Sequence, residues 1–577
     1  MHREVRAVTH DLVIRGGTVV DGSGDPRFTA DVAVDGTTIT EVGRVEGRGR
    51  RELSADGLIV APGWVDIHTH YDGQVLWDPL LEPSSSQGVT TVLLGNCGVG
   101  FAPAHPEHRE WLIGLMEGVE DIPAPVLDEG IDWGWESFDQ YLDVLDDLPL
   151  AIDIATQIPH AALRVFVMGQ RGQEHGIAAT SAEIEEMSAE VERAIRAGAL
   201  GFSTSRSIHH VASDGRLTPS YGVSVSELTG IARALSRVGR GVVELAADLV
   251  DLDEEFAVLR AIAEAGRCGI SVGTVQYHER DPAHYRRLLA LMERANANGV
   301  AVRGQVCARP PGVIMALDGS QQPLLESSTY RSLAGLPLPA RVRELRRSEV
   351  RAQILDELAV QDPSTSLLYG KHPYVFALGT NARYGCALDD SIAAIAARTG
   401  RSREEVAYDM LVSDEGRGVL WAPASNFLTP NFDVTRELLV HPYTLPGVGD
   451  GGAHCRFICD TSFPTFLLTH WVRDAEPDQR LGLESVIKQQ CADTAAWVGL
   501  DDRGVLSPGR KADINVIDLD ALAIDRPEIR SDFPLGGKRL VQGATGYRTT
   551  IVAGEVVMDD SQHTGALPGR LARGGAR

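Results

Sequence analysis

The sequence predicts an α/β fold: a (β/α)8 TIM-like barrel with a composite β-sandwich domain built from both termini. Two observations support this prediction. Between about residues 61 and 495, apolar strand-like runs alternate with helical patterns, as in a barrel of parallel strands. At both ends of the chain, short alternating runs are separated by Gly and Asp, as in antiparallel hairpins. The 577 residues leave room for both parts.

The two ends of the chain, residues 1–60 and 496–577, contain the hairpin-like runs. Neither end has enough strands to close a sheet comfortably alone. Because chain termini often lie near each other, we expect the two ends to form one domain. The runs are 11–15, 18–21, 31–35, 38–41, 512–518 and 547–553.

The predicted barrel spans residues 61–495. Helical patterns at 182–196, 254–265 and 285–297 lie between its strand-like runs. Residues 308–370 break this rhythm, since they begin with Pro310-Pro311 and contain a charged helix near 340–358. We expect them to form an insertion over the mouth of the barrel. The strand-like runs are 90–94, 151–155, 198–202, 241–245, 270–275, 300–305 and 444–448.

Composition argues against several classes of partner. The chain has 54 Lys and Arg against 80 Asp and Glu, a net charge of −26. Nucleic acids and anionic membranes both need a basic surface, so neither is an expected partner. No run approaches the ~18 apolar residues of a membrane span, and no secretory signal is visible. Seven scattered cysteines are not a disulfide framework, and we therefore expect a reducing, cytoplasmic location.

The strongest chemical feature is the run Pro62–Asp72, which contains His68 and His70. The two histidines are two residues apart at the end of a strand-like run, so both imidazoles point to one face. At the carboxyl end of a barrel strand, that face is the mouth of the active site. Two neutral imidazoles provide half of a site for a divalent metal ion.

On these residues the chain resembles the amidohydrolase superfamily. Gly57–Asp66 leads into the His-x-His pair, and Gly504–Asp518 resembles the return of the chain into the composite domain. Three further runs resemble the N-acyl-D-amino-acid deacylase (D-aminoacylase) branch: Gly95–Gly100, Gly198–Thr204 and Gly449–His454. The resemblance covers almost the whole chain and implies a metallohydrolase barrel.

Lysine is scarce, since only Lys371, Lys488, Lys511 and Lys538 occur. Many amidohydrolases bridge two metal ions with a carboxylated lysine from a mid-barrel strand. With no lysine before Lys371, the composition excludes that arrangement. The resemblance implies Cys97 as a metal ligand instead, and a thiolate is a strong ligand for Zn²⁺.

Asp450 lies in the glycine-rich run Gly447–Ala453. The resemblance makes it the aspartate of the eighth strand, a metal ligand and the catalytic general base and acid. A carboxylate suits this role because it can take a proton from the attacking water and later protonate the leaving nitrogen. In this interpretation a metal-bound hydroxide attacks the amide carbonyl.

The chain departs from the deacylase pattern at strands five and six, where that branch carries histidines. Gly241–Asp248 contains no histidine, and Glu244 is the alternative ligand there. His278 follows the sixth strand-like run and is a further candidate metal ligand, although it lies beyond the apolar residues. The number of zinc ions, one or two, therefore stays open.

A single Zn²⁺ on His68, His70 and Asp450, with Cys97 near or bound, is the simpler prediction. Three protein ligands and one open position are what a catalytic zinc requires.

Two arginines are candidates for binding a substrate carboxylate. Arg206 falls at the end of a strand-like run, and Arg383 lies in the run Asn381–Tyr384. A guanidinium group can bind a carboxylate through two parallel hydrogen bonds.

The sequence and the resemblance together predict a metal-dependent hydrolase of linear C–N amide bonds. Its expected substrate is a small molecule, an N-acyl-D-amino acid or a related amide. Two alternatives stay open. One is a hydrolase of cyclic amides or ureides on the same barrel, and the other is a barrel that has lost metal ligands and does not hydrolyse amides. A homo-oligomer is compatible with the sequence.

Overall fold

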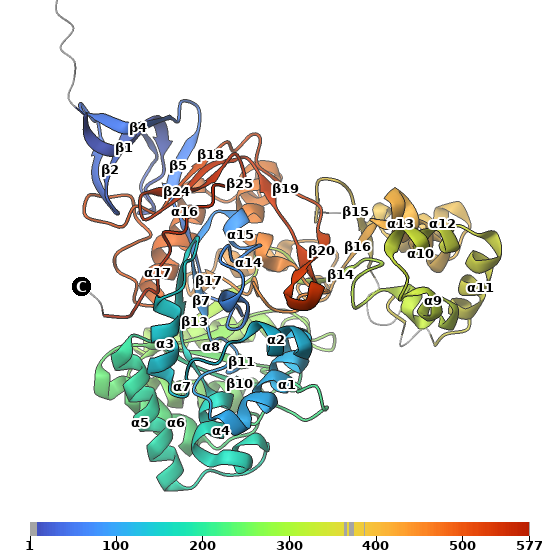
Figure 1. The fold of residues 1–577 in the computed structure, drawn as a ribbon, viewed down its shortest axis with the longest axis horizontal. Helices are drawn as coiled ribbons and strands as arrows, with labels where there is room; N and C mark the ends of the chain where they lie inside the picture. The colour runs from blue at the N-terminus through green and yellow to red at the C-terminus, as the bar shows by residue number, and fades with distance from the viewer. Residues whose placement is uncertain (1–7, 363–365, 369–373, 386, 576–577) are drawn as a thin grey trace, which may run out of the picture.

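The computed structural model describes residues 8–362, 366–368, 374–385 and 387–575. Small parts of the predicted amino-terminal segment (1–7), insertion (363–365 and 369–370) and carboxyl-terminal segment (576–577), and Lys371, lie outside the described residues. The chain forms a barrel with helices around it, a β-domain on one side and a helical lobe on the other (Figure 1).

The barrel is made of parallel strands in sequence order, as predicted. Two parallel sheets contribute eight strand positions, counting the successive segments β8 and β9 as one. Most of these strands are buried apolar runs, as expected for parallel strands covered on both faces. The strands are β6 (Trp64–Asp66), β7 (Val89–Leu94), β8 (Asp153–Thr156), β9 (Ile158–Pro159), β10 (Gly201–Arg206), β11 (Val242–Ala247), β12 (Gly269–Gly273), β13 (Val302–Val306) and β17 (Thr444–Pro446).

The barrel closes between its first and last strands. Just beyond β6 and β17, Thr69 and Gly451 form a parallel bridge. The His70 N–H donates to the Gly451 carbonyl at 2.6 Å. Closure brings the segments after β6 and β17 together at the carboxyl-terminal mouth.

Helices cover the outside of the barrel, and α4 to α8 pack on one another in succession. The predicted helices at 182–196, 254–265 and 285–297 are confirmed as α5, α7 and α8. The helices are α1 (Arg109–Glu120), α2 (Ala124–Gly130), α3 (Phe138–Asp146), α4 (His160–Met168), α5 (Ser181–Ala197), α6 (Val225–Val238), α7 (Leu252–Gly266), α8 (His284–Ala297), α14 (Asp433–Leu439), α15 (Phe463–Phe466), α16 (Leu483–Lys488) and α17 (Thr494–Trp497).

Two of the predicted strand runs differ from the structure at a glycine. The run 198–202 was expected to be a strand, but β10 begins at Gly201. Gly198 instead ends helix α5, with a φ of 127°. The runs 11–15 and 18–21 are one continuous strand, β1 (Val8–Val19), and not two strands of a hairpin. Gly16, with a φ of 69°, accommodates a bulge at that point instead of a turn.

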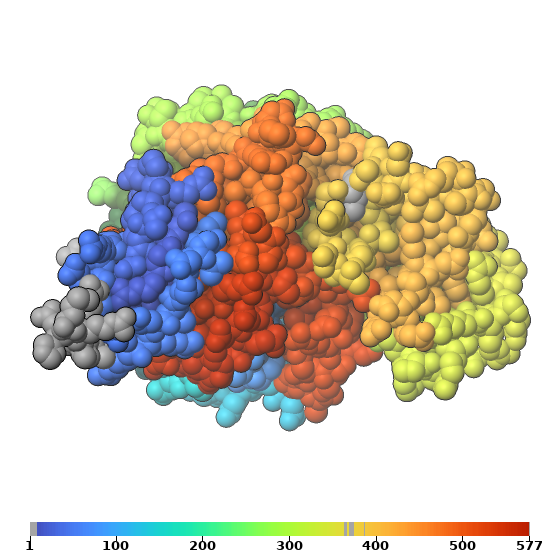
Figure 2. Space-filling view, turned by 90° about the horizontal axis from the view of Figure 1, so that it is seen from above, coloured from blue at the N-terminus to red at the C-terminus, as the bar shows by residue number. Residues whose placement is uncertain are grey.

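Strands from both ends of the chain form one nine-stranded sheet, as the composite domain requires. The joint is β18, which pairs antiparallel with β5 on one side and with β23 on the other. The blue and red ends of the chain accordingly lie side by side in Figure 2. The strands are β1, β2 (Phe28–Asp35), β3 (Thr38–Gly43), β4 (Arg48–Ser54), β5 (Ile59–Pro62), β18 (Ile514–Ile517), β23 (Tyr547–Val552), β24 (Glu555–Asp559) and β25 (Gln562–His563).

The described residues of the range 312–423, between β13 and α14, form the helical lobe and have their own hydrophobic cluster. The lobe extends past residue 370, where the predicted insertion ends. Instead of one charged helix at 340–358 it has two, because Arg347 adopts an extended conformation between them. The elements are β14 (Gly312–Met315), α9 (Ser328–Leu333), α10 (Leu338–Leu345), α11 (Ser348–Ala359), β15 (Phe376–Leu378), α12 (Ile392–Thr399), α13 (Arg403–Gly416) and β16 (Val419–Pro423).

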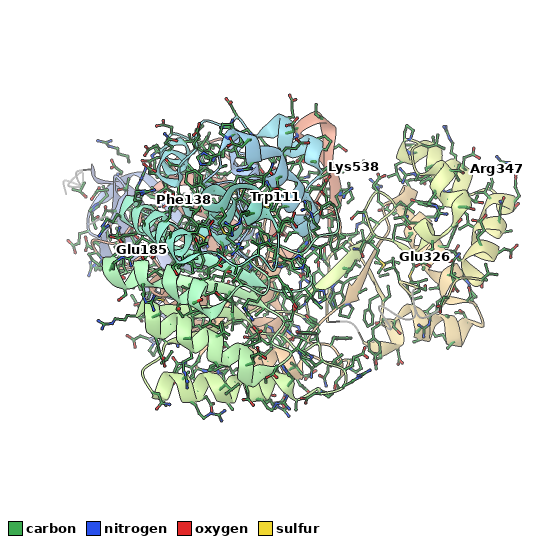
Figure 3. The ribbon with its side chains drawn as sticks, turned by 90° about the horizontal axis from the view of Figure 1, so that it is seen from below. Trp111, Phe138, Glu185, Glu326, Arg347 and Lys538 are labelled. Atoms are coloured by element: carbon green, nitrogen blue, oxygen red, sulfur yellow. The ribbon has the colours of Figure 1, made fainter. Side chains whose placement is uncertain are left out.

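The helical lobe stands apart from the barrel, as the positions of Glu326 and Arg347 show in Figure 3. Two short ribbons lie in the carboxyl-terminal part of the chain, and one of them carries Lys538. Its Nζ atom lies 3.0 Å from Asp318 Oδ1 of the lobe. The ribbons pair β19 (Ala523–Ile524) with β22 (Ala544–Thr545) and β20 (Glu528–Phe533) with β21 (Gly537–Val541).

Among the described residues, no helix has both the length and the apolar character needed to cross a membrane.

The central position of β18 predicts that the composite sheet depends on Ile514. This side chain is fully buried, at 0% exposure. We expect Ile514→Ala to lower the free energy of unfolding by about 2–5 kcal/mol, because it leaves a cavity. Urea unfolding of the purified protein measures this change. Ile177→Ala makes the same chemical change at a side chain that is 41% exposed, with an expected effect within about 0.5 kcal/mol. Equal effects of the two substitutions would contradict the buried, central position of Ile514 in the composite sheet.

Candidate functional site

The His-x-His pair lies directly after β6, at the mouth of the barrel. The side chain between the two histidines, Thr69, points away and donates from its hydroxyl to the Leu93 carbonyl at 2.8 Å. His68 and His70 therefore share one face, as the alternation of a strand requires. Both are buried, at 4% and 2% exposure.

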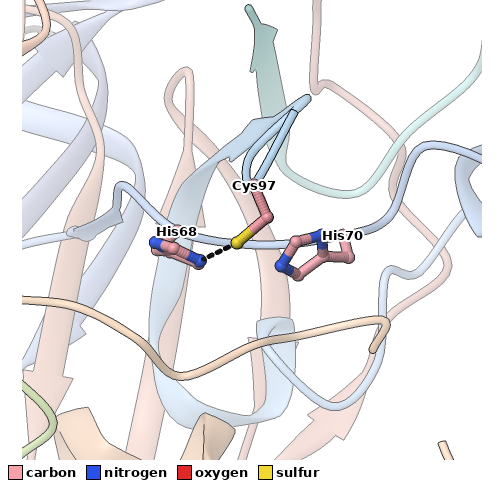
Figure 4. A group of neighbouring side chains, drawn as sticks. All are labelled: His68, His70 and Cys97. Carbon is pink, nitrogen blue, oxygen red and sulfur yellow. Dashed lines mark hydrogen bonds between the residues drawn. The ribbon is translucent and has the colours of Figure 1, made fainter. Parts of the chain in front are cut away.

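Cys97 occupies a tight turn after β7. It has a φ of 55°, a left-handed conformation that is strained for a residue with a side chain. Asn96 holds the turn by donating to the carbonyls of Thr69 and Leu93 at 3.1 and 2.8 Å. The turn brings Cys97 Sγ to 3.4 Å from His68 Nε2. Figure 4 shows the thiol between the two imidazoles, each of which directs a ring nitrogen toward it.

The side chains of His68, His70 and Cys97 form a group that could hold a metal ion. One ligand atom from each of His68, His70 and Cys97 can be chosen so that all three lie within 4.8 Å of one another. All three residues are buried. Two imidazoles and a thiol are the donor types that zinc prefers.

Asp450 completes the arrangement from the other side of the barrel closure. Its Oδ1 lies 3.4 Å from His68 Nε2 and 3.9 Å from His70 Nε2. This oxygen is buried and has no hydrogen-bond partner among the described residues. The φ of Asp450 is 49°, so its backbone, like that of Cys97, is held in the left-handed region.

Glu244, on β11, lies beneath Cys97. Its Oε2 accepts a hydrogen bond from the Cys97 N–H at 2.7 Å. Its Oε1 is buried and has no hydrogen-bond partner among the described residues. The residue at strand five thus supports the cysteine turn and leaves one carboxylate oxygen unpaired.

Burial governs the protonation of the acidic groups here. It raises the pKa of Asp66, Asp72 and Glu244 to about 7 in each case. It also raises the pKa of Asp450, and it raises the pKa of Glu120 well above the usual range together with the neighbouring carboxylates. Several carboxyl groups are therefore buried close together and repel one another when ionised. A bound cation would reduce this repulsion.

The same burial acts on the remaining donors. It raises the pKa of the Cys97 thiol well above its usual range, with further contributions from Glu244 and Glu120. It lowers the pKa of His70 well below its usual range, with His68 and His454 nearby. A neutral imidazole is the form that binds a metal, and a bound metal itself holds a thiolate deprotonated.

The structure does not bring His278 to this group. The apolar strand β12 ends at Gly273, five residues before His278. The His278 ring packs at a tilt against Tyr277 and His284, with ring centroids 4.1 and 3.9 Å away.

The two candidate arginines have other surroundings. Arg206 does lie at the end of β10, as predicted, but its guanidinium group forms two hydrogen bonds to Glu255 of α7, at 2.8 and 2.9 Å. Arg383 lies near Asp474 and helps to lower the pKa of that carboxyl group. Arg206 thus already binds a carboxylate of the protein in the way that was predicted for a substrate carboxylate.

Three polar residues around the site were not predicted to belong to it, and they are Gln305, Glu120 and His454. Gln305, on β13, accepts or shares the proton of His68 Nδ1 at 2.5 Å, and its amide donates to Ser271 Oγ at 3.0 Å. Glu120, at the end of α1, lies 3.2 Å from His70 Nδ1. His454 Nε2 lies 3.9 Å from the other oxygen of Glu120. A polar residue inside an apolar strand was the one available signal, and it applies to Gln305.

Comparison with known proteins places these features in a family. The model of the amidohydrolase family matches residues 51–558. The chain is 29% identical to a D-aminoacylase of Alcaligenes xylosoxydans xylosoxydans, over 97% of each chain. It is also 29% identical to an N-acyl-D-glutamate deacylase of that organism, over 89% of this chain and 88% of the other.

Two solved structures share the fold. A D-aminoacylase superposes with a TM-score of 0.65 at 24% identity, over 98% of this chain and 100% of the other. An N-acyl-D-glutamate deacylase from Bordetella bronchiseptica, solved with zinc and a phosphonate inhibitor, gives a TM-score of 0.63 at 24% identity, with the same coverage.

The raised pKa of Asp72 predicts a pH dependence of stability in chelator-treated protein. Its pKa is about 7 in the folded state, against about 3.9 in an unfolded chain, so the folded state binds the extra proton between these values. This stabilising contribution is complete below about pH 4 and is lost as the pH rises through 7. Its slope is at most about 1.4 kcal/mol per pH unit.

Urea unfolding of the wild type and of Asp72→Asn from pH 5 to 8 measures this contribution. The free energy of unfolding should fall with pH more steeply in the wild type. Asp25→Asn, at an exposed aspartate, controls for the substitution itself. Parallel curves for the wild type and Asp72→Asn would show that this carboxyl group is not the source.

Proposed function

The chain belongs to the amidohydrolase family, and we propose that it is a zinc-dependent hydrolase that removes the acyl group from N-acyl-D-amino acids. The observation that carries this proposal is the convergence of His68, His70 and Cys97 around the unpaired Oδ1 of Asp450. The two relatives named above, a D-aminoacylase and an N-acyl-D-glutamate deacylase, support the substrate class.

The residues present fit a zinc ion. His68, His70 and Cys97 supply nitrogen and sulfur donors, and Asp450 adds an oxygen donor that lacks a hydrogen-bond partner. An unpaired buried carboxylate oxygen is costly unless a cation or a proton compensates it. When bound, zinc would polarise the amide carbonyl and lower the pKa of a water molecule.

Asp450 carries the proton transfers in this proposal. Its oxygen lies beside both histidines, and burial raises its pKa. A carboxylate in this position can accept a proton from a water molecule and later release it. It would take a proton from the attacking water and then deliver it to the nitrogen of the leaving amine. His68 and His70 act as ligands.

We propose one zinc ion and not two. At strand five, Glu244 takes the place of the histidine expected from the deacylase branch, and one of its oxygens already accepts the Cys97 N–H. At strand six, Ser271 accepts a hydrogen bond from the side-chain amide of Gln305. His278 packs against His284 and does not join the group around His68. The histidine ligands of a second ion therefore have no counterpart at these positions.

The substrate is a small molecule, and we propose that the enzyme works in a reducing, cytoplasmic compartment. A ligand thiol at Cys97 must stay reduced. The six cysteines described by the structure are all free. Reducing conditions keep such thiols unpaired.

Removal of the histidines tests the metal site. We expect the double variant His68→Ala, His70→Ala to lose both zinc and the hydrolysis of N-acetyl-D-amino acids, because two of the three clustered donors disappear. Elemental analysis and a panel of N-acetyl-D- and N-acetyl-L-amino acids measure the two losses. His175→Ala, at an exposed histidine, is the matched control. Full activity in the zinc-free double variant would refute the proposal, and turnover of cyclic amides alone would favour the alternative substrate class.

Replacement of Asp450 by asparagine tests the proton transfer. An amide cannot take a proton from water, so we expect kcat of Asp450→Asn to fall by about 10²–10⁴-fold at saturating zinc. Steady-state kinetics with zinc in excess separate this loss from weaker metal binding. A variant with the kcat of the wild type would show that another group moves the proton.

A further inference from the structure

Glu120 is a buried carboxylate outside the predicted metal site. It is the last residue of α1, and it is only 1% exposed. Its carboxylate faces two imidazoles, with Oε1 at 3.2 Å from His70 Nδ1 and Oε2 at 3.9 Å from His454 Nε2. An ionised carboxylate is expensive to bury, so its position beside an imidazole calls for a reason.

The two nitrogens of each clustered histidine face different partners. His68 Nδ1 lies 2.5 Å from Gln305 Oε1, while its Nε2 faces Cys97 and Asp450. His70 follows the same plan: Nδ1 faces Glu120, while Nε2 faces Asp450. Both Nε2 atoms are therefore left for the interior of the cluster, and both Nδ1 atoms are turned outward onto an oxygen.

We propose that Glu120 is a positioning residue that holds His70 with Nε2 directed into the cluster and strengthens it as a metal donor. This inference rests on the proposed zinc site. A carboxylate that accepts the outer N–H of a ligand histidine fixes its tautomer and makes the inner nitrogen more basic. Gln305 fixes the tautomer of His68 in this way, but it is a neutral amide and supplies no charge.

The Glu120–His70 contact is an ion-pair distance and not an aligned hydrogen bond. His70 Nδ1 has no hydrogen-bond partner among the described residues. The terminal torsion of a glutamate is broad, so a small rotation of the carboxylate suffices to align it.

The end of α1 is held in place from two other sides. The Glu120 carbonyl accepts the His454 N–H at 2.5 Å. The next residue, Asp121, pairs with Arg456 and accepts a hydrogen bond from Ser320 of the helical lobe at 3.1 Å. Glu120 is thus fixed by the loop after β17, and the lobe is tied to the same helix end.

Zinc affinity of Glu120 variants tests the inference. We would measure it by competition with a chromophoric chelator for the wild type, Glu120→Gln, Glu120→Ala and Glu117→Gln. Glu117 lies one turn earlier on α1 and provides the matched loss of charge. We expect about 10–100-fold weaker binding for Glu120→Ala, a smaller loss for Glu120→Gln, which keeps an oxygen near Nδ1, and no change for Glu117→Gln.

The Tm of the zinc-free proteins separates positioning from mere structure. Because glutamine keeps the size of the side chain and one oxygen, the Tm of zinc-free Glu120→Gln should stay close to that of the wild type, while its zinc affinity falls. Wild-type affinity in both Glu120 variants, or a loss of affinity matched by a loss of zinc-free Tm, would overturn the inference alone. A wild-type protein that binds no zinc would overturn the proposed function with it.

Discussion

The closure of the barrel between β6 and β17 is the constraint on which the site depends. The bridge from Thr69 to Gly451 places Asp450 beside the two histidines, although these residues are far apart in sequence. The contact leaves little room for variation. A side chain at Gly452, which has a φ of 87°, would meet the His70 backbone at 2.8 Å. The left-handed conformation of Asp450 is sustained by this close packing.

Charge gives this geometry its chemistry. Several carboxylates are buried around a thiol and two imidazoles, and burial raises the pKa of Glu244 and Asp72 to about 7. Without a cation such a group of acids is held largely by protons. A divalent ion would replace those protons and hold Cys97 as a thiolate. The proposed role of Glu120 follows instead from its place beside His70 Nδ1.

Local sequence patterns predicted the parts of the site that lie on the chain as short motifs. His68 and His70 show a strand period, so their common location could be expected. Cys97 was predicted from the resemblance to the deacylase branch. Contacts between distant elements could not be predicted in this way. Glu120 reaches the site from the end of helix α1. Glu255, on helix α7, binds the guanidinium group of Arg206, which had been predicted to bind a substrate carboxylate. The same distinction holds for the fold. The alternation of strands and helices in the barrel was visible in the sequence, whereas the bulge in β1 arises from its pairing with β2.

The ligand set is the central claim, and the X-ray absorption spectrum of the zinc-loaded protein tests it most directly. A site made of His68, His70, Cys97 and Asp450 predicts one sulfur atom at about 2.3 Å from zinc and nitrogen or oxygen atoms at about 2.0–2.2 Å. The sulfur contribution should disappear in Cys97→Ser. A wild-type spectrum with nitrogen and oxygen neighbours alone would contradict the account.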